Sequence, residues 1–81
     1  MAGKTATLYR MVLPEHVCPF GVAARRMLDE TGFVVDEHIL RSRAEVDEFE
    51  AMHGVDTTPQ VFIDGERVGG SDVLERFLER V

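Results

Sequence analysis

Alternation of strand-like and helix-like segments limits this chain to few folds. Strands are predicted where β-branched and aromatic residues gather, over residues 5–11, 33–40, 61–63 and 67–69. Helices are predicted where apolar residues recur every three or four positions, over residues 19–31, between Ser42 and Gly54, and over residues 71–81. Crossovers are right-handed, so the first two strands are predicted to be parallel, and a tight turn makes the last two antiparallel. The fold class is therefore α/β, a four-stranded mixed sheet covered by three helices.

The first helix begins directly after the only cysteine of the chain. Pro19 falls in the first helical turn, where an N–H would have no intrahelical partner. Gly32 follows the last apolar residue and is predicted to be a left-handed C-terminal cap. Residues 12–17, which contain Pro14, are predicted to form a loop. Cys18 is therefore placed at the N-terminus of a helix.

Short signals mark the ends of the later elements. Ser42 and Glu45 have the spacing of a capping box at the start of the second helix. The Asp64-Gly65 pair supplies the positive φ angles of a tight hairpin. Ser71 is predicted to be the N-cap of the third helix, since a hydroxyl there satisfies a free backbone N–H.

The net charge and the cysteine content limit the partners and the cellular setting that are expected for this chain. The 81 residues include 15 acidic and nine basic side chains, and a net charge of −6 is the wrong sign for holding a phosphate backbone. Nucleic acid is therefore excluded as a partner. The chain has no stretch of about 20 apolar residues and no basic leader, so no membrane partner is expected. The length of 81 residues predicts one domain, over residues 1–81. The single cysteine indicates a reducing, cytoplasmic setting.

Two pairs of residues on the expected elements have no assigned chemistry. His38 and His53 lack ligand-like spacing to each other or to Cys18, so no metal site made by the protein alone is predicted. Met27 and Met52 fit the apolar faces of their helices and are expected in the core.

Cys18 has two interpretations. Unpaired backbone N–H groups and the dipole of the following helix favour a thiolate over a thiol, which would make Cys18 a nucleophile. His16, two residues upstream, would add positive charge nearby. The alternative is that Cys18 is simply a small buried apolar residue. Pro19 in the next position favours the reactive thiol.

Two further segments have the residues of a peptide-binding site. Thr57 and Thr58 precede Pro59, and we expect a cis bond at this proline, because it would let the Thr58 backbone pair with an extended peptide-like ligand. The alternative is an ordinary turn. In the segment from Gly69 to Asp72, glycines permit close approach and helix amides can bind a carboxylate. The alternative there is a glycine turn followed by an N-cap.

Together these segments resemble the glutaredoxin family. The resembling motifs are Cys18-Pro19-Phe20, residues 57–65, and Gly69-Gly70-Ser71-Asp72. The resemblance extends from Leu8 to Leu78 and implies a thioredoxin-like fold with a glutathione site. It implies that Cys18 is the nucleophile, that Thr58 pairs with the cysteinyl backbone of glutathione, and that Ser71 with Asp72 holds the γ-glutamyl end. The other site residues that it implies are Pro19, Phe20, Thr57, Pro59 and Gly70.

The chain departs from the family pattern at two places. Gly21 stands where dithiol members have a second cysteine, so turnover would need a second thiol from solution. A cysteine introduced at Gly21 is expected to form a disulfide with Cys18, since this is the spacing of redox dithiols. The lysine that such members carry shortly before the motif is absent. Candidates to bind the glycyl carboxylate of glutathione are Arg10, His16 and Arg43.

The resemblance implies a monothiol, glutathione-dependent thiol–disulfide oxidoreductase. Its substrates would be glutathionylated or disulfide-bonded molecules, and we expect a monomer. Two alternatives remain open. One is a dimer that holds a [2Fe–2S] cluster through Cys18 and glutathione, although Pro19 stiffens the backbone where such proteins have glycine. The other is a non-catalytic interaction module that binds glutathione.

Overall fold

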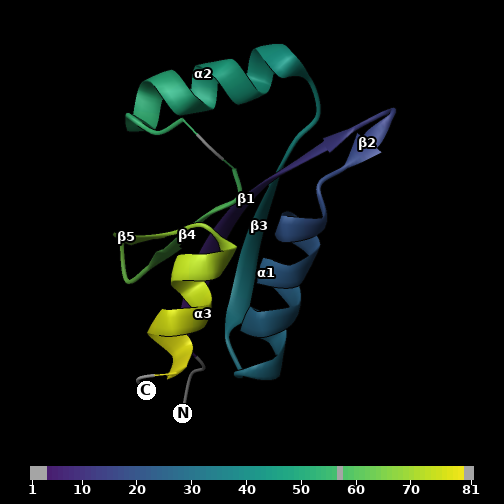
Figure 1. Cartoon of the computed structure of the whole chain (residues 1–81). Coiled ribbons are helices and arrows are strands. Elements are labelled where there is room, and N and C mark those ends of the chain that lie inside the picture. The colour runs from purple at the N-terminus through teal and green to yellow at the C-terminus, as the bar shows by residue number, and fades with distance from the viewer. Residues whose placement is uncertain (1–3, 57, 80–81) are drawn as a thin grey trace.

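The computed structural model describes residues 4–56 and 58–79 (Figure 1). Within these residues the elements follow in the order β1 (Thr5–Leu13), β2 (His16–Val17), α1 (Pro19–Glu30), β3 (Val34–Leu40), α2 (Arg43–His53), β4 (Gln60–Ile63), β5 (Glu66–Gly69) and α3 (Ser71–Glu79). Apart from β2, this is the predicted order of strands and helices.

Strand β1 lies at the centre of the sheet. It pairs in parallel with β3, from Thr5 opposite Val34 to Met11 opposite Leu40. On its other side it pairs antiparallel with β4, and β4 pairs antiparallel with β5. The predicted mixed sheet, with parallel first and second long strands and an antiparallel hairpin at its end, is confirmed.

The prediction that residues 12–17 form a loop is wrong. β1 continues to Leu13, and β2 folds back on it with Val12 opposite Val17 and Leu13 opposite His16. Pro14 lies in the two-residue turn, where its missing N–H removes no ladder hydrogen bond. The sheet therefore has five strands rather than four, and the added hairpin projects beyond the others in Figure 1.

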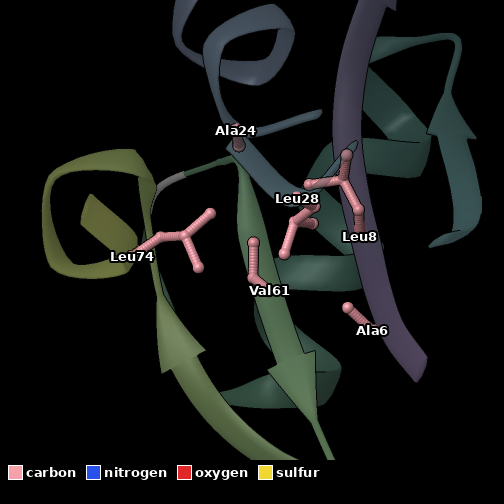
Figure 2. Packing of buried hydrophobic residues seen from close by; sticks show 6 residues of the cluster. All are labelled: Ala6, Leu8, Ala24, Leu28, Val61 and Leu74. Atoms are coloured by element: carbon pink, nitrogen blue, oxygen red, sulfur yellow. The ribbon is translucent and has the colours of Figure 1, made fainter. Parts of the chain in front are cut away.

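Alternate residues of β1 face two separate apolar clusters. Ala6 and Leu8 are fully buried on the face covered by α1 and α3. Figure 2 shows their partners on this face: Ala24 and Leu28 from α1, Val61 from β4, and Leu74 from α3. Tyr9 and Met11 face the other side, where they pack against Leu40, Val46 and Phe49. Helix α2 therefore covers the opposite face of the sheet.

Local signals for chain reversal are confirmed. Gly32 and Gly54 both have left-handed backbone conformations after their helices, with φ angles of 85° and 66°. Asp64 and Gly65 have φ angles of 54° and 81° between β4 and β5, as a tight hairpin requires.

The capping box before α2 is modified. The Ser42 hydroxyl accepts a hydrogen bond from the Glu45 N–H at 3.1 Å, as predicted. The Glu45 carboxylate, however, accepts from the N–H of Arg41 at 2.8 Å, one residue further from the helix. The cap therefore also fixes the chain that leaves β3.

Helix faces are less buried than their apolar patterns suggest. Met27 packs against the first cluster, but Met52 is 71% exposed, so its predicted core position is wrong. Instead of Met52, the neighbouring His53 contacts the sheet, where its ring centroid lies 5.5 Å from that of Phe62. In α3 only Leu74 is fully buried. Val81, the last residue of the predicted stripe, lies outside the described residues. No helix in the described part of the chain is long and apolar enough to cross a membrane.

Candidate functional site

Cys18 occupies the N-cap position of α1. Its backbone is extended, with φ −67° and ψ 118°, and its carbonyl accepts hydrogen bonds from Gly21 N–H at 3.1 Å and Val22 N–H at 3.4 Å. The thiol makes no capping hydrogen bond, so it does not saturate the free amides of the first turn. The predicted position of Cys18 at the helix N-terminus is confirmed.

The thiol is recessed among exposed apolar neighbours. Cys18 is 8% exposed, whereas Val17 and Phe20, on either side of it in the sequence, are 50% and 63% exposed. Val22, one residue into the helix beyond Gly21, is also exposed. Exposed apolar side chains beside a buried thiol offer a contact surface to a ligand that approaches it.

The bond between Thr58 and Pro59 is cis, as predicted. Pro59 is buried and Thr58 is half-buried, while Thr57 lies outside the described residues. Pro59 also meets the start of α3, because a Cβ on Gly70 would be 3.4 Å from the Pro59 carbonyl oxygen. Two of the segments singled out from the sequence are thus in contact.

Gly70, not Ser71, is the cap of α3. The Gly70 carbonyl accepts the first helical hydrogen bond, from Leu74 N–H at 2.9 Å, so Ser71 is already the first helical residue. The predicted N-cap role of Ser71 is therefore wrong. The carboxylate of Asp72 accepts from the N–H of Val73 at 2.9 Å and is otherwise exposed at the positive end of the helix.

The three segments lie at the same end of the sheet. Figure 1 shows the first turns of α1 and α3 and the chain entering β4 at the same end of the molecule. Two helix N-termini and the backbone segment at the cis proline therefore lie at this end of the sheet. Such an arrangement favours an anionic, peptide-like ligand next to the thiol.

The sequence of the chain matches the model of one known protein family. The Glutaredoxin model matches residues 6–68 of the chain. The chain belongs to the glutaredoxin family. It is also similar to hybrid peroxiredoxin hyPrx5 of Haemophilus influenzae, with 42% identity over 60 residues that cover 74% of this chain and 25% of that protein. The chain spans about a quarter of the length of this relative.

Solved glutaredoxin structures share the fold. Glutaredoxin 1 from Francisella tularensis, complexed with cacodylate, has a TM-score of 0.84 and 25% identity over 95% of this chain and 94% of its own. The buckwheat glutaredoxin–glutathione complex has a TM-score of 0.75 and 18% identity over 95% and 70%. The predicted thioredoxin-like fold is confirmed.

In this glutaredoxin Arg10 forms a partly buried ion pair with Glu37. Its Nε donates to Glu37 Oε2 at 2.7 Å, and the two side chains are only 19% and 22% exposed. Glu37 Oε1 lies 3.4 Å from Nη1 of Arg25 on α1. A hydrogen bond with Asp29, and further attraction to Glu37, raise the pKa of Arg25 above its usual value, so Arg25 stays charged. Arg10 is thus committed to Glu37 rather than free at the surface.

The other two candidates for the glycyl carboxylate are exposed. His16 lies in β2, two residues before Cys18. Arg43 begins α2 and its Nη1 lies 3.6 Å from the sulfur of Met11, near the end of β1. Neither forms an ion pair with any residue in the described ranges. Both therefore stay candidates for binding an anion.

The remaining histidines belong to a ring cluster below α2. His38 stacks on Tyr9, and His53 packs between Phe49 and Phe62. Among residues 4–56 and 58–79, no group of three His, Cys, Asp or Glu side chains could hold a metal ion.

Proposed function

We propose that this glutaredoxin is a glutathione-dependent thiol–disulfide oxidoreductase with a one-cysteine mechanism. The observation that carries the proposal is the position of Cys18, the only cysteine, as the N-cap of α1. A thiolate is the nucleophile in disulfide exchange, and the free backbone amides at this end of the helix can interact with an anion.

The reaction follows from a single thiolate. Cys18 Sγ attacks the glutathione sulfur of a mixed disulfide, an S–S bond forms between Cys18 and glutathione, and the substrate sulfur leaves as a thiolate that takes up a proton. A second glutathione thiolate then attacks the glutathione sulfur of this intermediate. Oxidised glutathione is released and Cys18 returns as a thiolate, so the net reaction consumes one reduced glutathione and converts the mixed disulfide into a free substrate thiol and oxidised glutathione.

The surroundings of Cys18 support glutathione as the bound half. The Thr58 backbone before the cis bond to Pro59 suits pairing with the cysteinyl residue of a tripeptide. Gly70, Ser71 and Asp72 at the start of α3 suit the α-carboxylate and amino group of its γ-glutamyl end. The buckwheat glutaredoxin, which has the same fold, is described as a glutathione complex.

We further propose a peroxiredoxin cysteine as one physiological substrate. The support is the 42% identity to a protein named as a hybrid peroxiredoxin, of which this chain matches a quarter. The exposed Val17 and Phe20 beside the recessed thiol would contact a protein substrate. A glutathionylated peroxiredoxin should then be reduced faster than a glutathionylated unrelated protein at equal concentration.

One-cysteine exchange is proposed in preference to cluster binding. Cys18 is 8% exposed and is followed by Pro19 at the first helical position, which fixes the backbone there. A thiol recessed in this way is better suited to attack the glutathione sulfur of a mixed disulfide than to bind an iron centre shared with a second chain.

The test is reduction of a small glutathione mixed disulfide, with glutathione reductase and NADPH reporting oxidised glutathione. The wild-type protein should catalyse turnover, and Cys18→Ser should give only the uncatalysed rate. Mass spectrometry of protein treated with oxidised glutathione should show one glutathione adduct, located on Cys18. A wild-type rate equal to that of Cys18→Ser would refute the proposal, and glutathione binding without turnover would instead favour a non-catalytic binding module.

A further inference from the structure

Gly21 packs against Arg10 with no room for a side chain. A Cβ added to Gly21 would lie 2.9 Å from the Cβ of Arg10, 3.3 Å from its Cδ and 3.6 Å from its Cγ. Carbon atoms in contact are normally about 3.5–4.0 Å apart. Because the nearest atom is the Cβ of Arg10, no change of rotamer can relieve the contact. Either β1 or the first turn of α1 would have to move.

Arg10 is also held in place. Its Nε is bound to Glu37 on β3, and Glu37 in turn reaches Arg25 on α1. Nη1 of Arg10 is buried and has no hydrogen-bond partner within the described residues. Displacing Arg10 would therefore separate a partly buried charge from its counterion, which is unfavourable. Interactions that link β1, β3 and α1 therefore all oppose a displacement of Arg10.

We propose that Arg10 is the specificity-determining residue that keeps this site single-thiol. Position 21 is three residues after Cys18 on α1, one turn along the helix, where a second thiol would lie beside the first. Arg10 excludes any side chain from that position. This inference rests on the proposed one-cysteine reaction, in which glutathione from solution resolves the mixed disulfide because the chain has no second cysteine.

The steric part is tested by a cycle of alanine variants. Glycine to alanine within a helix normally stabilises a protein, because alanine has the higher helix propensity. Gly21→Ala should instead lower the melting temperature by several degrees. In the Arg10→Gly background, where all three contacting atoms are gone, the same Gly21→Ala change should raise it. An unchanged or higher melting temperature for Gly21→Ala in the otherwise wild-type chain would overturn the proposal.

The chemical part is tested by cysteine variants treated with oxidised glutathione. An intramolecular disulfide forms by the reaction of the two protein thiols with one oxidised glutathione, which yields two reduced glutathione molecules. Residue spacing alone predicts that Gly21→Cys forms a disulfide with Cys18, but the contact with Arg10 reverses that expectation: Gly21→Cys should remain without a disulfide and carry glutathione adducts. Arg10→Gly with Gly21→Cys should close the disulfide, leave no free thiol and lose two mass units. Arg10→Ala with Gly21→Cys should close less completely, because the Cβ of residue 10 remains.

The outcomes separate this proposal from the proposed reaction. Complete disulfide closure in Gly21→Cys alone, or no gain from Arg10→Gly, would show that Arg10 is not the obstacle. If Gly21→Cys does not fold, the proposal is still tested by the cycle of alanine variants and by disulfide formation in Arg10→Gly with Gly21→Cys. Absence of glutathione turnover in the wild-type protein would remove the proposed function, whereas the packing between Arg10 and Gly21 would be measured by the same variants as before.

Discussion

The ring of Tyr9 lies nearly flat on the imidazole of His38, with centroids 4.7 Å apart and planes inclined by 17°. Tyr9 also packs against Phe49 at 4.6 Å and meets Phe62 edge-on at 5.8 Å. One residue of the central strand therefore contacts β3, α2 and β4. This ring cluster is the main attachment of α2 to the sheet.

Tyr9→Ala should lower the free energy of unfolding by about 3 kcal/mol, because it removes a large ring from the centre of a packed cluster. Tyr9→Phe keeps the ring and should stay within about 0.5 kcal/mol of the wild type. Equilibrium unfolding in urea measures both. A loss in Tyr9→Phe as large as that in Tyr9→Ala would mean that the hydroxyl, not the ring packing, matters.

Ser42→Ala should destabilise the protein by about 1 kcal/mol, because the Ser42 hydroxyl accepts the Glu45 N–H at the start of α2. Ser71→Ala is the matched control, since Gly70 caps α3. Its unfolding free energy should change by less than about 0.5 kcal/mol, while the KM for glutathione should rise under the proposed function. Equal losses of stability in the two variants would contradict the assignment of Gly70 as the cap.

Glu37→Ala should lower the free energy of unfolding by about 1–3 kcal/mol, because it leaves the guanidinium groups of Arg10 and Arg25 without their shared carboxylate. Asp36→Ala on the same strand is the control. Its carboxylate is 64% exposed and pairs with His38, so the loss should stay below about 0.5 kcal/mol. Chemical denaturation of Glu37→Ala and Asp36→Ala measures both losses of unfolding free energy. Similar losses in the two variants would show that the Arg10–Glu37 contact adds no stability.

Phe20→Ala should raise the KM for glutathione several-fold with little change in melting temperature, because Phe20 is 63% exposed and follows the Cys18-Pro19 pair. Val34→Ala, 59% exposed on β3, is the control for loss of an exposed apolar side chain. Steady-state kinetics and thermal unfolding separate the two effects. An unchanged KM in Phe20→Ala would remove Phe20 from the proposed glutathione site.

Signals that act within a few residues were sufficient to predict the chain reversals. Gly32, Gly54 and the Asp64-Gly65 pair all adopt the expected positive φ angles, since few residues tolerate that conformation. The helix start after Cys18 was predicted from an equally local signal, Pro19 in the first turn, whereas the cis bond before Pro59 was expected because it would let Thr58 pair with a peptide-like ligand. These local features account for much of the candidate site.

Features that depend on packing between elements were missed. Arg10 was predicted to be a candidate for binding the glycyl carboxylate of glutathione, although Ala6 and Leu8, at alternate positions before it, face the buried side of the sheet. That spacing of two was a signal that Arg10 faces inward as well. No pattern in the sequence indicated Glu37 as its partner, or the contact with Gly21, because both arise only when strand and helix meet.

The hairpin of β1 and β2 changes how the nucleophile is presented to a ligand. A free loop before Cys18 would lose backbone freedom each time glutathione bound, which weakens affinity. Here Val17, the residue before Cys18, is already paired with Val12 in the sheet. The ordering therefore accompanies folding, not binding. Under the proposed function, glutathione binds next to a preorganised thiol, and its affinity reflects contacts made at a site whose approach strand is fixed beforehand.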